Sequence, residues 1–297
     1  MTVADVPPFI DRTNHRSLAA HTGDIFVWDI DKTYLDTRFS SLRGLLSIPL
    51  EFAVDKRAVP GAVPLLRAIR RGPGPKSALT PLYFVSGSPR QLRPVIEQKM
   101  TLDGVDFDGI TFKDHLALLR SIRTSGLLAQ VGYKLLALLL YRLEAHPAAT
   151  WWLVGDDVEA DEAVFLLFRE VCGGLKGKSL DKALQERGVN SDQRRRCISL
   201  ADCLSGDMSP FGGIFIHLAS GHAPLASTTL GVYQTLSYVQ VALVLASAGR
   251  IQERDLRAVT ADLRRHHMTE AMIEKHLEDA VIRLGVPETF CPYVRLP

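Results

Sequence analysis

The chain has 297 residues, of which 46% are hydrophobic and 23% charged, and its formal net charge is +2. These values are typical of a folded globular protein with one large domain, or with a domain and an appendage, and they exclude a disordered chain. A charge so near to balance does not indicate a nucleic-acid partner, and we predict none.

The cysteines and the N-terminal residues bear on the compartment. None of the four cysteines forms a CxxC pair, so we expect reduced structural thiols. The first residues lack a cationic start followed by an apolar run, so we predict no signal peptide and a cytoplasmic location.

The run from Ser209 to Gly249 has no Asp, Glu, Lys or Arg, but glycine, proline and polar residues interrupt it. We therefore predict no transmembrane span there, and instead a buried strand followed by a buried helix.

Apolar runs that end in polar residues alternate with helical patterns along the first two thirds of the chain. The predicted strands are 24–29, 81–86, 150–155 and 213–218. The predicted helices are 60–71, 89–100, 127–145, 160–172 and a weaker one starting at a Ser179 cap. This alternation predicts βαβ units and an α/β fold with a Rossmann-like parallel sheet, whose ligands bind beyond the carboxyl ends of the strands.

The alternation stops near residue 221. Three helices are predicted after it, over 230–248, 252–266 and 269–284. We therefore divide the chain into a catalytic domain, residues 1–220, and a small C-terminal helical appendage, residues 221–297. The helix 230–248 is apolar around much of its circumference, so we expect it to be buried and covered by the two helices that follow.

Asp29 and Asp31 close the first predicted strand in the sequence DIDKT. Residues two apart at a strand end point to the same side, so both carboxylates can face one ligand. Phosphoryl transfer through an enzyme nucleophile needs a carboxylate that attacks and a second group that protonates the leaving oxygen. An acidic pair at a strand end can also simply cap a helix.

Two further segments offer groups that bind anions. In FVSGSP, Ser86 ends a strand, and Gly87 and Ser88 lead toward a helix whose first amides could hold a phosphate. An ordinary serine cap is the alternative. Lys134 is a charge within an apolar helix, so it either has a buried anionic partner or extends to solvent.

The third predicted strand ends in GDDVEAD, which places Asp156 and Asp157 at the strand end and Asp161 one turn later. Carboxylate oxygens are the ligands that magnesium prefers, and waters and a substrate phosphate usually complete its shell. Taken alone, GDD occurs more often as a surface turn than as a metal site.

These four segments, in this order, resemble the phosphatases of the haloacid dehalogenase superfamily. Over residues 24–168 the chain is similar in particular to the catalytic domain of the actin-patch-associated phosphatidate phosphatases. The resemblance implies a magnesium-dependent phosphomonoester hydrolase that works through an aspartyl phosphate. The substrate would be a phosphomonoester, with phosphatidate or another lipid phosphate as candidates, and a lipid substrate would involve peripheral contact with a membrane.

The resemblance also implies roles for individual residues. Asp29 would be the nucleophile and Asp31 the general acid and base, while Ser86 and Lys134 would hold the phosphoryl group. Thr33 would orient the loop, and Gly87 and Ser88 would bind substrate. The implied magnesium ligands are Asp29, the main-chain carbonyl of Asp31, Asp156, and Asp157 or Asp161 in support.

The chain departs from the family at Lys32, Asp157 and Arg90, where the family commonly has other residue types. Because all three are expected around the pocket, the substrate can differ from phosphatidate. Two alternatives stay open: a catalytically idle scaffold of the same fold that binds a phospholipid or a protein, and a phosphotransferase that passes the group to an alcohol. The sequence does not define the substrate, the oligomeric state, the pathway or the role of the C-terminal helices.

Overall fold

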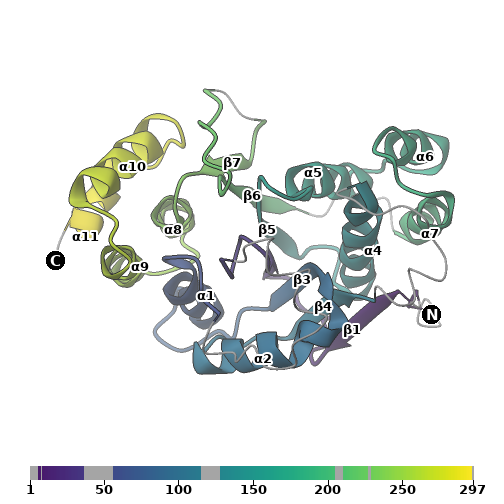
Figure 1. The fold of residues 1–297 in the computed structure, drawn as a ribbon, viewed down its shortest axis with the longest axis horizontal. Coiled ribbons are helices and arrows are strands. Elements are labelled where there is room, and N and C mark those ends of the chain that lie inside the picture. The colour runs from purple at the N-terminus through teal and green to yellow at the C-terminus, as the bar shows by residue number, and fades with distance from the viewer. Residues whose placement is uncertain are drawn as a thin grey trace.

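The computed structural model describes residues 6, 7, 9–36, 56–114, 128–204, 210–226 and 229–295. Within these ranges the chain forms one seven-stranded, mostly parallel sheet and ten α-helices, an α/β fold of the Rossmann-like class. Figure 1 shows the sheet in the middle of the molecule with helices on both of its faces.

The strand order determines where a ligand can bind. The strands are β1 (Ile10–Asn14), β2 (Asp24–Asp29), β3 (Leu82–Pro89), β4 (Gly109–Lys113), β5 (Thr150–Asp156), β6 (Phe211–His217) and β7 (Val232–Thr235). They lie in the order β1-β4-β3-β2-β5-β6-β7, and only β1 is antiparallel to its neighbour. From β2 the chain first adds β3 and β4 on one side of this strand, and it then adds β5, β6 and β7 on the other side. The carboxyl ends of β2 and β5 therefore mark the switch point, where such sheets bind ligands.

Two hydrophobic layers flank the sheet because alternate side chains of a strand face opposite sides. In β2, Phe26 and Trp28 belong to one layer, and Ile25 and Val27 belong to the other. The first layer is covered by α1 (Ala62–Arg71), α2 (Arg93–Leu102), α8 (Tyr238–Ser247) and α9 (Glu253–Arg265). The second is covered by α4 (Leu128–Glu144), α5 (Asp161–Cys172), α6 (Gly177–Glu186) and α7 (Ser191–Asp202).

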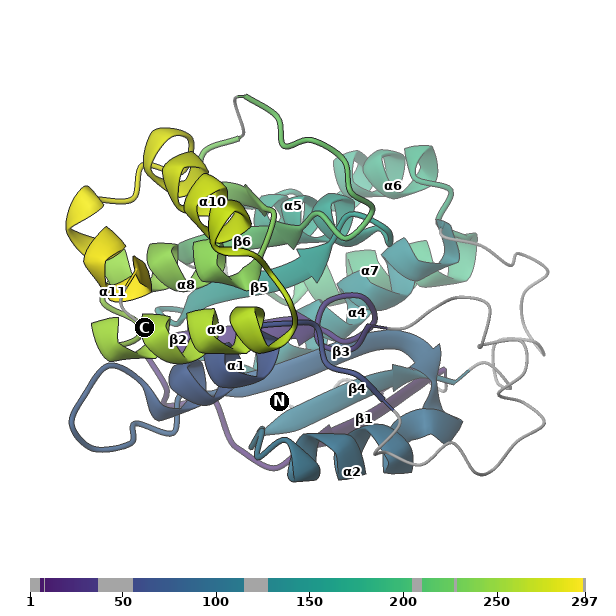
Figure 2. The same cartoon turned by 60° about the vertical axis from the view of Figure 1, so that its left-hand side comes forward.

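The C-terminal helices add to the first layer. Residues Tyr238 to Ala246 of α8 are all buried, and α9 and α10 (Glu270–Ile282) both pack against α8. The short helix α11 (Cys291–Arg295) packs against α9. Figure 2 shows these helices outside α8 and α1. The expectation of a buried helix covered by its two successors is confirmed for α8.

The predicted alternation of strands and helices is confirmed by β2, β3, β5 and β6 and by the helices between them. The prediction of one helix over 230–248 is wrong at its start. Residues Val232–Thr235 form strand β7 on the edge of β6, and the helix begins only at Tyr238. A short apolar run is ambiguous between strand and helix, and the unpaired edge of β6 decides it here. The residues of the predicted appendage thus include one strand of the sheet, and the division at residue 220 stays a prediction.

Smaller differences concern other elements. The helix predicted from Ser179 begins at Gly177 and has no side-chain cap, because Lys176 and not Ser179 precedes its first turn. Strands β1 and β4 and helix α7 were not predicted, since their residues show neither clear alternation nor a long apolar run. No helix in the described ranges has both the length and the apolar character that crossing a bilayer requires.

Candidate active site

Asp29 and Asp31 lie at the carboxyl end of β2. Asp29 is its last residue, and the chain then turns sharply through Lys32, whose φ of 61° is left-handed. The turn is closed by hydrogen bonds from the Lys32 amide to the Leu35 carbonyl, 2.8 Å, and from the Tyr34 amide to the Ile30 carbonyl, 2.9 Å. The side chains of Asp29 and Asp31 are both buried.

Asp31 is held by the end of β3. The hydroxyls of Ser86 and Ser88 donate hydrogen bonds to its Oδ2, at 3.1 and 2.6 Å, and the Ser88 amide donates to Ser86 Oγ at 3.0 Å. Burial raises the pKa of Asp31 and the Glu159 charge raises it further, while the two serine hydroxyls partly offset this. A carboxyl group with a raised pKa is suited to act as a general acid and base.

The segment after Ser88 differs from the prediction. Strand β3 continues to Pro89, a 3-10 turn follows at Arg90–Leu92, and α2 begins only at Arg93. Gly87 therefore lies in a bulged strand end and not at the first turn of a helix. Its lack of a side chain leaves room for Gln130, whose Nε2 would be 3.2 Å from a Cβ at this position. The expected contribution of a helix terminus to anion binding is thus absent at Gly87 and Ser88.

Lys134 reaches the site from α4 and is 1% exposed, so it does not extend to solvent. Its Nζ contacts Asp29 Oδ1 at 2.7 Å, Glu159 Oε2 at 2.6 Å and Asp161 Oδ1. Burial alone would lower the pKa of Lys134, but the charges of Asp161, Asp29 and Glu159 hold it well above its usual value. The ammonium group is therefore charged at neutral pH, and it is the cation that a phosphoryl group could contact.

Asp156 ends β5 beside Asp29. Its Oδ1 accepts hydrogen bonds from the amides of Val158 and Glu159, at 2.6 and 2.8 Å, and Thr33 Oγ1 donates to its Oδ2 at 3.3 Å. Thr33 belongs to the loop that carries Asp31, and it thus also holds the carboxylate of Asp156 in place. The loop after β5 turns back around Asp156, which orients the carboxylate toward β2.

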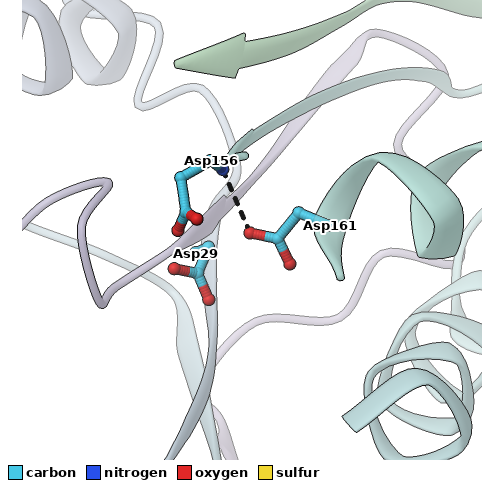
Figure 3. A group of neighbouring side chains, drawn as sticks. All are labelled: Asp29, Asp156 and Asp161. Atoms are coloured by element: carbon cyan, nitrogen blue, oxygen red, sulfur yellow. Dashed lines mark hydrogen bonds between the residues drawn. The ribbon is translucent and has the colours of Figure 1, made fainter. Parts of the chain in front are cut away.

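Asp29, Asp156 and Asp161 form one group in which one carboxylate oxygen of each residue lies within 4.8 Å of the other two. Figure 3 shows the side chains converging, with the Asp156 amide donating to Asp161 Oδ2 at 3.2 Å. The close approach of Asp161 requires a glycine at position 155, because a Cβ there would lie 2.5 Å from Asp161 Cβ. The glycine of the GDD sequence therefore leaves the space that the side chain of Asp161 occupies.

The three carboxylates oppose one another's ionisation. Burial and the Asp161 charge raise the pKa of Asp156 to about 7. Burial and the same charge raise the pKa of Asp29, although Lys134 opposes the shift, and burial also raises the pKa of Asp161. A divalent cation would relieve this repulsion, and hard carboxylate oxygens are ligands that suit magnesium.

The negative charge and the oxygen ligands of the three carboxylates are thus suited to a small cation. One atom is also available for it: among the described residues, Asp29 Oδ2 is buried without a hydrogen-bond partner. A buried carboxylate oxygen without a partner is costly, and a metal ligand role would remove that cost.

No protein-family model, curated protein or solved structure matches this chain.

The structure does not bring all predicted metal ligands together. Asp157 Oδ1 accepts from the Ser220 amide at 2.9 Å, and its Oδ2 contacts the Ser220 hydroxyl and, at 3.4 Å, His222 Nδ1. Asp157 is thus turned toward the loop after β6, while Asp161 takes part in the group. The ligand predicted from Asp31 is its main-chain carbonyl, so it stays a prediction, and the Asp31 side chain is bound to the two serines.

Glu159 is the residue that the sequence analysis missed. It lies in the loop between β5 and α5, its side chain is 4% exposed, and it pairs with Lys134. The signal was present in GDDVEAD, where an acidic residue stands two positions before Asp161. Its burial could not be read there, because acidic residues in a loop between strand and helix are usually exposed.

Proposed function

We propose that the chain is a magnesium-dependent phosphomonoester hydrolase of the haloacid dehalogenase type, with Asp29 as nucleophile. One observation carries the proposal: a buried carboxylate at the switch point of the sheet is paired with a buried lysine, and a second, serine-bound carboxylate follows two residues later. These residues would supply an attacking group, a proton donor and a cation that binds phosphate.

In the first half of the reaction, Asp29 attacks phosphorus. A bond forms between a carboxylate oxygen of Asp29 and phosphorus, and the bond from phosphorus to the ester oxygen breaks. Asp31 gives its proton to that oxygen, and the alcohol leaves. Lys134 stabilises the negative charge on the phosphoryl oxygens, since it is charged and already within hydrogen-bond distance of Asp29.

In the second half, Asp31 is ionised and takes a proton from a water molecule, which attacks phosphorus. The bond between phosphorus and Asp29 breaks, and inorganic phosphate and the free carboxylate are restored. The hydroxyls of Ser86 and Ser88 stabilise ionised Asp31 between the two halves, because both donate to its Oδ2. If an alcohol entered in place of water, the same residues would perform phosphotransfer.

Magnesium would be held by Asp29, Asp156 and Asp161, whose oxygens converge and whose pKa values are raised first by burial and then by neighbouring carboxylates. When bound, it would neutralise charge on the phosphate. The carboxylates of these three residues are positioned by Lys134, by the amides after β5 and by Thr33.

The test is phosphate release by the purified full chain from a panel of phosphomonoesters that includes micellar phosphatidate. We expect turnover that requires magnesium and stops with EDTA. Asp29→Asn should fold and lose activity by about a thousandfold or more, because an amide does not attack phosphorus. Asp157→Asn is the matched control, since it removes an adjacent carboxylate that faces Ser220, and it should keep most of the activity.

Activity of Asp29→Asn near that of the intact chain would disprove the mechanism. Absence of turnover on every ester, together with retained binding of a phospholipid or a protein, would favour the idle scaffold. Transfer of phosphate to added alcohols in preference to water would favour the phosphotransferase.

A further inference from the structure

The hydrogen-bonding capacity of Lys134 is fully used in this structure. An ammonium group has three hydrogens and accepts none. Its three partners are Asp29, Glu159 and Asp161, each at hydrogen-bond distance. A phosphoryl oxygen that binds to Lys134 must therefore replace one of these carboxylates.

Two of the three partners are fixed by other contacts. Asp29 ends β2 within the sheet, and in the proposed reaction it must stay beside the phosphorus that it attacks. Asp161 begins α5, its Oδ2 accepts from the Asp156 amide at 3.2 Å, and its side chain packs against Gly155. Neither can leave Lys134 without dismantling the group of three carboxylates.

Glu159 has more freedom. It lies in the four-residue loop between β5 and α5, and its carboxylate is carried on a longer side chain than the two aspartates. Its other oxygen, Oε1, accepts from Gln130 Nε2 at 3.3 Å. Gln130 in turn lies against Gly87, between the two serines that hold Asp31. Glu159 is thus a carboxylate placed on Lys134 beside the residues proposed to hold the phosphoryl group.

We propose that Glu159 occupies the phosphoryl position on Lys134 in the substrate-free protein and is displaced when a phosphate monoester binds. This inference rests on the proposed function for the identity of the ligand. Displacement restores a donor on Lys134 and removes a like charge from the pocket. Glu159 is therefore a positioning residue that acts through Lys134, and it weakens binding of substrate and of the phosphate product alike.

The test compares Glu159→Gln with the intact chain by calorimetric titration of inorganic phosphate in the presence of magnesium. The amide keeps the size of the side chain and removes the charge. We expect phosphate to bind about tenfold more tightly to the variant, because the side chain that competes with phosphate for Lys134 has lost its negative charge. In turnover, KM should fall by a similar factor while kcat changes less, a division that a structural role alone would not produce.

Glu162→Gln is the matched control. Glu162 lies three residues further along, where it contacts Gln234 at 3.4 Å and not Lys134. The control removes the same charge nearby, so it should leave phosphate affinity and KM nearly unchanged. Equal tightening in both variants would show a general charge effect and overturn the displacement.

Unchanged or weaker phosphate binding in a folded Glu159→Gln variant would also overturn the inference. If that variant does not fold, a structure of the intact chain with magnesium and phosphate decides. Glu159 still within hydrogen-bond distance of Lys134 beside bound phosphate contradicts the inference, and Glu159 displaced from Lys134 upholds it. Because binding is measured without turnover, tighter phosphate binding by a protein that hydrolyses no ester would refute the proposed function and keep the displacement.

Discussion

Tyr238, the first residue of α8, donates a hydrogen bond from its hydroxyl to the main-chain carbonyl of Thr33, 205 positions earlier in the chain. Its ring stacks on Trp28, with centroids 5.3 Å apart, and on His217 at 5.1 Å. The C-terminal segment therefore supports the loop that carries Asp31 and Thr33, and is linked to the site by a polar contact as well as by apolar packing.

We expect Tyr238→Phe to lower the free energy of unfolding by about 1–2 kcal/mol, because the buried Thr33 carbonyl loses its donor while the ring contacts stay. Tyr133→Phe is the control, since the Tyr133 hydroxyl is buried without a hydrogen-bond partner among the described residues. That change should be neutral or stabilising. Urea denaturation followed by tryptophan fluorescence measures both, and equal effects would contradict the assigned role of the Tyr238 hydroxyl.

The stability of the metal-free protein should fall as the pH rises from about 4 to about 7 and should level off above that. The pKa of Asp156 is raised from 3.8 to about 7, so between these values the folded chain binds a proton that the unfolded chain has lost. Each such proton contributes a slope of about 1.4 kcal/mol per pH unit. In EDTA, Asp156→Asn should flatten this decline in urea denaturation. A decline equally steep in the variant would exclude Asp156 as its cause.

The same protonation competes with the proposed cation. We expect magnesium to raise the melting temperature more at pH 8 than at pH 6, because the carboxylates that repel one another at pH 8 are those that would bind it. Asp156→Asn should remove most of this stabilisation. A magnesium effect that is larger at pH 6 would argue against binding by these groups.

Gly155→Ala should lower the free energy of unfolding by about 1–3 kcal/mol, because the new methyl group overlaps the side chain of Asp161. Displacement of Asp161 should also weaken magnesium binding, measured by calorimetric titration. Gly74→Ala is the control, since its Cβ would meet its nearest neighbour, the Lys76 carbonyl, at an ordinary 3.4 Å. Unchanged metal affinity in folded Gly155→Ala would remove Asp161 from the proposed ligands.

Deleting residues 221–297 should cause aggregation. The deletion removes β7 from the edge of β6 and α8 from the layer that contains Trp28 and Phe215. An exposed strand edge beside a large apolar surface promotes association between chains. Size-exclusion chromatography checks this, and a monomeric fragment 1–220 with a cooperative unfolding transition would show that the catalytic part folds independently.

The sequence by itself determined those parts of the protein that depend on neighbouring residues. The apolar runs of β2, β3 and β5 each end in polar residues, and buried parallel strands have this pattern because both of their faces are covered. The sequence alone therefore assigns Asp29, Asp31 and Asp156 to one edge of a sheet. For Lys134 the sequence allowed two outcomes, a buried anionic partner or extension to solvent.

Where a local sequence pattern permits two outcomes, the tertiary structure alone decided between them. Residues Val232–Thr235 become a strand because β6 offers them an edge, although their apolar character also suits a helix. Asp157 and Asp161 are equally plausible ligands in the sequence, but Ser220 holds one of them away and the missing side chain of Gly155 admits the other. Glu159 contacts Lys134 only because α4 and the loop after β5 meet in space, a contact between residues 25 positions apart that no local pattern specifies.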